Sequence, residues 1–214
     1  MLFIVLSLIA GVVASPPAYN SRPYANVHNR QAGSYNSSSV EVDLGYSTYR
    51  GFVNSSSNLD VFLGIRFAAP PVGSLRWQAP RAAVLNNSAV IDATSYPAQC
   101  PQGYDNAGGI DSPVDNSASN EDCLFLNIWR PNNVTGPLPV FFYIHGGGYG
   151  AGNGQTDFTP IVNTNENKFV AVGIQYRLGA FGFLASDEVY RKGVVNAGLL
   201  DQHLALQVCL SPSI

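Results

Sequence analysis

Charged side chains are scarce in this sequence. Only 12% of its 214 residues are charged, and the net charge is -3. Nucleic-acid binding needs clustered Lys and Arg to neutralise phosphates, so this composition argues against nucleic acid as a partner. After the first 14 residues there is also no apolar run of the roughly 20 residues needed to cross a bilayer. The hydrophobic fraction of 46% instead predicts a globular core.

The longest apolar block stands at the beginning of the sequence. Residues Leu2–Ala14 are apolar apart from one serine, and Ser15-Pro16-Pro17 follows them. Such a block with small residues at its end predicts a secretory signal peptide over residues 1–14, hence a secreted protein. A membrane anchor or a buried helix is the alternative. Residues 15–39 are rich in Pro, Ser, Asn and Tyr, which predicts a flexible arm.

Sequons and cysteines agree with secretion. Four N-x-Ser/Thr sequons predict glycosylation, and they begin at Asn36, Asn54, Asn86 and Asn133. There are three cysteines. In an oxidising compartment Cys100 and Cys123 are expected to pair, which leaves Cys209 as a free thiol; the alternative is two unpaired buried thiols.

Hydrophobic patterns predict several strands and one helix. A hairpin is expected over Val40–Phe52, and further strands over Val61–Ala68, Leu124–Trp129, Val140–Ile144 and Phe169–Tyr176. The run at 140–144 is apolar on both faces, as in a strand buried within a sheet. Asn196 is predicted to cap a helix over Ala197–Gln207, with Leu199, Leu200, Ala205 and Leu206 as its apolar stripe. This order predicts α/β architecture with a mixed sheet.

A glycine-rich loop follows the apolar strand at 140–144. The sequence there is His145-Gly146-Gly147-Gly148. A strand that breaks into such a loop is able to aim backbone N–H groups at the oxyanion of a tetrahedral intermediate. Its usual counterpart is a nucleophilic serine in G-x-S-x-G, and the sequence contains no such pentapeptide. The nearest candidate, Gly45-Tyr46-Ser47-Thr48-Tyr49, lacks the second glycine.

Dinucleotide binding is a second interpretation of the same glycines. Gly146–Ala151 fits the pattern G-x-G-x-x-A after a strand. A Rossmann turn opens directly into a helix that holds the pyrophosphate, whereas Gly152-Asn153-Gly154-Gln155 is typical of a loop. The acyl-transfer interpretation is therefore preferred.

Five blocks of this sequence, taken in order, resemble the type-B carboxylesterases, a family that includes secreted lipases and cholinesterases. The blocks are Gly64–Gly73 with Leu75-Arg76-Trp77, then Glu121–Trp129, His145–Gly148, Tyr176–Leu184 and Asn196–Gln202. The resemblance implies an incomplete α/β-hydrolase fold with a mixed, mostly parallel central sheet. It covers residues 40–207 as a partial carboxylesterase domain, and residues 208–214 form a tail that does not resemble the family.

The resemblance also implies roles for particular residues. Gly147 and Gly148 match the positions whose N–H groups form the oxyanion hole. Cys100 and Cys123 match a family disulfide. Two structural ion pairs are implied, Arg76 with Glu121 and Arg177 with Asp201. His145 is expected to shape the loop, while His28 and His203 have no expected catalytic role.

The function expected from the resemblance is that of the N-terminal third of a secreted serine carboxylic ester hydrolase. In the family, the nucleophilic serine, the acid and the histidine come later than Ile214 in the chain. We therefore expect this chain to be inactive by itself, and we expect the strand at 140–144 to form a sheet edge. Small-molecule or lipid carboxylic esters are the expected substrates of the whole protein, with no cofactor and no metal. The alternative is a non-catalytic, cholinesterase-like adhesion module, although such a protein has no need for the glycine loop.

Overall fold

The structure is a computed structural model that describes residues 39–103, 119–132 and 134–210. The predicted signal peptide, the predicted arm up to residue 38 and residues 211–214 lie outside the described residues, as do Asn36 and Asn133. Asn86 lies in a described strand, but its side chain is outside the description. No helix within the described ranges has both the length and the apolar character required for a membrane span.

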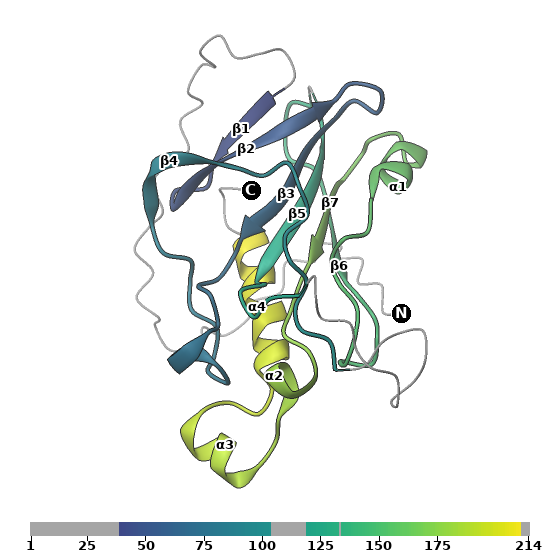
Figure 1. Cartoon of the computed structure of the whole chain (residues 1–214). Coiled ribbons are helices and arrows are strands. Elements are labelled where there is room, and N and C mark those ends of the chain that lie inside the picture. Colours follow the sequence, from purple (N-terminus) through teal and green to yellow (C-terminus); the bar gives the residue numbers. More distant parts are fainter. Residues whose placement is uncertain (1–38, 104–118, 133, 211–214) are drawn as a thin grey trace, which may run out of the picture.

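A mixed seven-stranded sheet organises the described residues (Figure 1). Six of the strands follow the order β1-β2-β3-β5-β7-β6, and β4 pairs with β2 beside that path. The strands are β1 (Ser39–Asp43), β2 (Ser47–Asn54), β3 (Leu59–Arg66), β4 (Asn86–Asp92), β5 (Phe125–Pro131), β6 (Val140–Ile144) and β7 (Val170–Ile174). The hairpin and the other four strands expected from the sequence are therefore present, whereas β4 was not expected.

Most strand pairs in the described sheet are antiparallel, which corrects one expectation. The mixed sheet is confirmed, but "mostly parallel" is wrong for these residues. The β1–β2, β2–β3, β3–β5 and β5–β7 pairs are antiparallel. Only β2–β4 and β6–β7 are parallel. Short turns join β1 to β2 and β2 to β3, and they account for two of the antiparallel pairs because parallel neighbours need a long crossover. The β3–β5 and β5–β7 pairs join strands that are not consecutive along the chain.

Strand β6 forms an edge of the sheet, as expected. Among the described residues it pairs with β7 alone. Val140 is 41% exposed, and the aromatic residues Phe141, Phe142 and Tyr143 are only half-buried. Strand β6 is thus apolar on both faces, which is typical of a strand within a sheet, although it lies at the edge of the described sheet.

Helices cover both faces of the sheet. Alternating residues of β5 and β7 face a larger cluster that includes Ala205 and Cys209 of helix α4 (Ala197–Cys209). The other face carries a smaller cluster in which Trp129 packs with Phe158 and with Val162 of helix α1 (Thr159–Thr164). The remaining helices are the 3-10 helix η1 (Gly73–Leu75), α2 (Gly179–Phe183) and α3 (Asp187–Lys192), and Figure 1 shows α2 and α3 together at one end of the molecule.

Helix α4 buries a stripe that agrees with the predicted one only at Ala205. Its buried side chains follow an i, i+4 spacing through Ala197, Asp201, Ala205 and Cys209, whereas Leu199 is 44% exposed. Asn196 occupies the N-cap position, but its side chain makes no capping hydrogen bond. Its carbonyl oxygen instead accepts the backbone N–H of Leu199 at 3.0 Å.

The buried Cys209 thiol is expected to be unreactive in the folded protein. Burial raises its pKa to about 12. At pH 8 only about one thiol in ten thousand is then the nucleophilic thiolate. We expect iodoacetamide to leave the native protein unlabelled and to label one cysteine after denaturation and all three after denaturation with reduction, as measured by mass spectrometry. Rapid labelling of native protein would contradict this burial.

Candidate active site

The glycine loop begins where β6 ends. Its backbone is left-handed at three consecutive residues, with φ of 116° at Gly147, 59° at Gly148 and 63° at Tyr149. The Gly147 carbonyl oxygen accepts the N–H groups of Gly150 at 3.1 Å and Ala151 at 3.0 Å. Positive φ at both central residues is the signature of a type I′ turn, and it explains the preference for glycine here. The sequence predicted the loop, and the structure gives it a defined shape.

Glycine is required at 147 for space as well as for φ. A Cβ there would overlap the carbonyl oxygen of Ala151. The neighbouring Gly146 differs, because a Cβ at that position would meet nothing within 4 Å. Gly148 is exposed, and its N–H donates to no other residue in the described part of the chain. The exposed Gly148 amide is therefore accessible to a ligand oxygen.

His145 anchors the start of the loop through contacts with Tyr176 and Gly146. Its ring stacks on Tyr176 with the ring centroids 4.4 Å apart, and the Tyr176 hydroxyl donates to the His145 carbonyl oxygen at 2.9 Å. Burial lowers the pKa of His145, while a contact between its Nδ1 and the Gly146 carbonyl oxygen opposes that shift. The neutral imidazole is favoured in this setting. The contacts of His145 thus serve the shape of the turn.

The Gln102 side chain holds the end of the glycine loop at Gly152, and we call this contact the Gln102 clamp. The sequence analysis did not predict it. The Gln102 side chain accepts the Gly152 N–H at 2.6 Å and donates to the Gly152 carbonyl oxygen at 3.1 Å. It also donates to the Cys100 carbonyl oxygen at 2.6 Å. Next to it, the Gly103 N–H donates to the Gly150 carbonyl oxygen at 2.6 Å. A single amide side chain therefore satisfies both backbone groups of one loop residue.

A disulfide anchors the segment that carries this clamp. Cys100 and Cys123 are bonded, with their Cα atoms 5.0 Å apart, and both are buried. The pairing is the one predicted. Closing a loop of this length stabilises a fold by roughly 3.5 kcal/mol on the chain-entropy model. The disulfide therefore fixes the position of Gln102 relative to β5.

Both predicted ion pairs are present. Arg76 donates to Glu121 at 2.6 and 2.5 Å. Arg177 donates to Asp201 at 2.8 and 2.7 Å from its side chain and at 3.0 Å from its backbone N–H. Burial raises the pKa of Asp201, and the three hydrogen bonds from Arg177 oppose that shift. The second pair links the end of β7 to α4.

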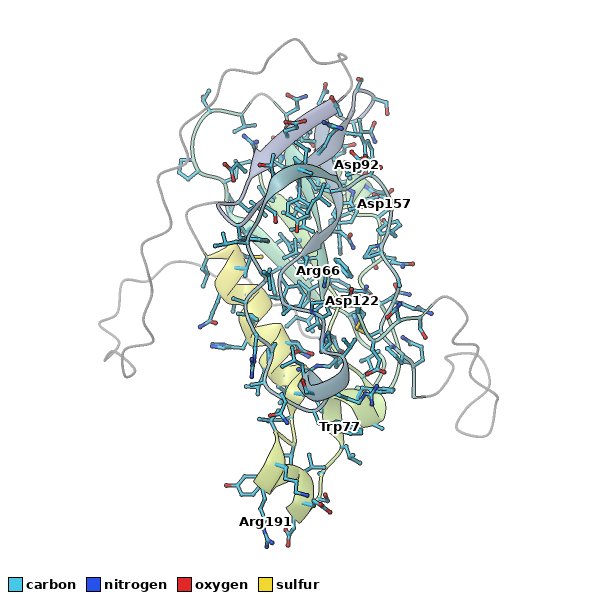
Figure 2. The ribbon with its side chains drawn as sticks, turned by 60° about the vertical axis from the view of Figure 1, so that its left-hand side comes forward. Arg66, Trp77, Asp92, Asp122, Asp157 and Arg191 are labelled. Carbon is cyan, nitrogen blue, oxygen red and sulfur yellow. A yellow bond between two sulfur atoms is a disulfide. The ribbon has the colours of Figure 1, made fainter. Side chains whose placement is uncertain are left out.

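A third ion pair was not predicted. Arg66, at the end of β3, donates to both carboxylate oxygens of Asp122 at 2.5 and 2.8 Å, and Figure 2 labels the two residues close together. The guanidinium also lies over the Phe125 ring, 4.4 Å from its centroid. Both residues stand inside blocks that the sequence analysis had singled out, 56 positions apart, but the resemblance implied no pairing between them.

Other candidate residues have no catalytic setting. Ser47, in the imperfect G-x-S-x-G look-alike, is 3% exposed within β2, and its hydroxyl donates to the Tyr46 carbonyl oxygen at 2.7 Å. His203 is exposed on α4, and His28 lies outside the described residues. In the described ranges, no group of three or more His, Cys, Asp or Glu side chains is placed to hold a metal ion.

Comparisons with known proteins agree on one family. The model of the carboxylesterase family matches residues 37–209. Carboxylesterase 1D of Rattus norvegicus is 37% identical over 96% of this chain and 34% of the relative. Acetylcholinesterase of Electrophorus electricus is 38% identical over 72% of this chain and 25% of the relative.

Solved structures give the same result. The structure of Aspergillus niger EstA has a TM-score of 0.68 and 38% identity, over 79% of this chain and 32% of that one. A PNB esterase has a TM-score of 0.69 and 31% identity, over 80% of this chain and 34% of that one. The chain spans about a third or less of the length of these proteins.

Two neighbouring glycines give a matched test of the loop geometry. We expect Gly147→Ala to lower the free energy of unfolding by about 1–3 kcal/mol, because alanine is strained at that φ and its Cβ overlaps Ala151. Gly146→Ala should stay within about 0.5 kcal/mol of the parent, because its Cβ enters open space. Urea unfolding monitored by fluorescence measures both. Equal effects of the two substitutions would contradict this loop shape.

The clamp gives a second prediction. We expect Gln102→Ala to lower the free energy of unfolding by about 1–3 kcal/mol and to speed amide hydrogen exchange at Gly152, which loses its partners. Gln207→Ala on the exposed side of α4 is the control and should change neither quantity. Unchanged exchange at Gly152 in the Gln102 variant would show that the loop does not depend on this side chain.

Proposed function

The chain belongs to the carboxylesterase family, and we propose that it supplies the oxyanion-hole part of a secreted serine carboxylic ester hydrolase. The observation that carries the proposal is the left-handed backbone at Gly147 and Gly148, placed directly after β6 and held by contacts on both sides. Backbone N–H groups fixed in advance stabilise developing negative charge without any reorganisation during the reaction.

The proposed chemistry is acyl transfer. A serine oxygen from the remainder of the protein attacks the ester carbonyl carbon, and a base takes the serine proton. The carbonyl oxygen becomes an oxyanion, and the N–H groups of Gly147 and Gly148 donate to it. The alkoxide then leaves with a proton, and water releases the acid from the acyl-enzyme. Losing one oxyanion donor typically lowers kcat by about 100- to 1000-fold.

The 214 residues by themselves are proposed to be inactive towards esters. They contain no G-x-S-x-G, and the one serine in a similar sequence, Ser47, is buried in β2. An oxyanion hole without an attacking group does not form the tetrahedral intermediate that it would stabilise. The proposed substrates of the whole protein are small-molecule or lipid carboxylic esters.

Secretion and glycosylation belong to the same proposal. The apolar block at residues 1–14, four sequons and the Cys100–Cys123 disulfide all fit passage through an oxidising secretory compartment. The structural neighbours and relatives are esterases, carboxylesterases and acetylcholinesterases by name. These names favour a carboxylic ester as the ligand of this site rather than a nucleotide.

A chimera tests the proposed role of the loop. Residues 39–207 replace the matching part of the PNB esterase, and hydrolysis of p-nitrophenyl acetate is measured. We expect the chimera to be active, Gly147→Ala to lower kcat by about 100-fold or more, and Gly146→Ala to retain activity. An active chimera that tolerates Gly147→Ala would refute the oxyanion role. Ester turnover by the isolated 214-residue chain above a heat-inactivated control would refute the proposed inactivity.

A further inference from the structure

An aromatic cavity lies on the face of the sheet that carries the smaller core cluster. Its volume is about 260 Å³, and its walls include the rings of Phe52, Tyr96 and Trp129. Polar groups stand at its edge, among them Asn54 and Asp157. Figure 2 labels Asp157 near the upper end of the molecule, far from Trp77 at the lower end. The residues of the glycine loop take no part in this cavity.

Asn54 begins one of the sequons and is the last residue of β2. The Ser56 hydroxyl, the other essential group of the sequon, donates to the Asn54 side-chain oxygen Oδ1 at 2.8 Å. The side-chain nitrogen Nδ2, which is the atom that carries a sugar in glycoproteins, donates to no residue in the described part of the chain. The chain turns here, because the Ser57 N–H donates to the Asn54 carbonyl oxygen at 3.2 Å.

Phe52 stands two residues before Asn54 on the same strand. Side chains at i and i+2 of a strand point to the same face, and both of these residues line the cavity. The face of an aromatic ring is electronegative, so it attracts the weakly positive C–H groups on one face of a sugar ring. A sugar attached to Asn54 therefore has an aromatic surface beside its point of attachment, with Tyr96 on the cavity wall as well.

We propose that Asn54 is glycosylated and that the first N-acetylglucosamine of its glycan lies in this cavity against Phe52. The inference rests on the proposed passage through the secretory compartment. In the covalent step, the Asn54 Nδ2 loses a proton and forms a bond to the anomeric carbon of a lipid-linked oligosaccharide pyrophosphate. The bond from that carbon to the pyrophosphate oxygen breaks, and the lipid pyrophosphate leaves. The attached sugar then covers apolar surface that the described residues leave open at this cavity.

Two enzymes with different products separate the first sugar from the rest of the glycan. The 214-residue chain is secreted from cells that keep glycans in the high-mannose form, with the other three sequons removed by Asn→Gln substitution. Endoglycosidase H leaves one N-acetylglucosamine on Asn54, whereas peptide N-glycosidase F removes it. We expect the trimmed protein to keep the Tm of the intact glycoprotein, and complete removal to lower Tm by about 2–4 °C.

Matched variants assign that shift to the aromatic contact. Phe52→Leu keeps an apolar side chain but removes the ring, and it should abolish the Tm difference between the two enzymatic products. Asn54→Gln removes the sequon while keeping an uncharged amide and should melt like the fully deglycosylated protein, which excludes an effect of the Asp that the second enzyme creates.

Three results would overturn the inference: glycopeptide mass spectrometry that finds Asn54 unmodified in the secreted protein, equal Tm values for the two enzymatic products, or a Tm difference that persists in Phe52→Leu. None of these readouts depends on ester hydrolysis. Failure of the inference is therefore distinguishable from failure of the proposed enzymatic role.

Discussion

The buried contact between Arg177 and Asp201 is the interaction on which the arrangement of the described fold depends. It joins the end of β7 to α4, and the Arg177 side chain also donates to the Gln78 carbonyl oxygen at 2.9 Å. The two side chains are 3% and 0% exposed. Removing one partner of such a pair leaves the other charge buried and unpaired, which typically destabilises a protein by about 3–5 kcal/mol. Two glycines, Gly182 and Gly198, pack so closely on the Arg177 carbonyl oxygen that neither has room for a Cβ. The close packing on the Arg177 backbone therefore explains the need for glycine at positions 182 and 198.

The glycine loop is positioned by this frame rather than by its own sequence alone. The Gly179 N–H, at the start of α2, donates to the Tyr149 carbonyl oxygen at 2.8 Å, so the segment that follows β7 holds one side of the loop. Gln102 and Gly103 hold the other side. A loop fixed at both ends keeps its N–H groups in one orientation, which a binding site for a transient oxyanion requires. The parallel pairing of β6 with β7 brings these segments to the same end of the sheet.

Local patterns predicted the strands and the resemblance implied the disulfide and two ion pairs, whereas contacts that neither signal marks were missed. The α/β-hydrolase fold, the strands, the disulfide and two ion pairs were predicted correctly, because strand patterns and short blocks identify them. The Gln102 clamp joins residues 50 positions apart, and a single glutamine carries no local signal of such a contact. The stripe of α4 was predicted correctly at Ala205 but wrongly at Leu199, because hydrophobicity favours Leu199 over Asp201, whereas the pairing with Arg177 buries the acid. The parallel character of the sheet was overestimated because two early hairpins and the β3–β5 and β5–β7 pairs are all antiparallel.

The position of Gln102 two residues after Cys100 couples the shape of the loop to thiol oxidation. The Gln102 side chain accepts from and donates to the backbone of Gly152. The disulfide between Cys100 and Cys123 fixes the position of the short segment that carries Gln102. A newly made chain in a reducing cytosol has neither that bond nor the constraint that it places on Gln102. The geometry of the glycine loop is thereby linked to the oxidation state of two cysteines that lie outside the loop itself.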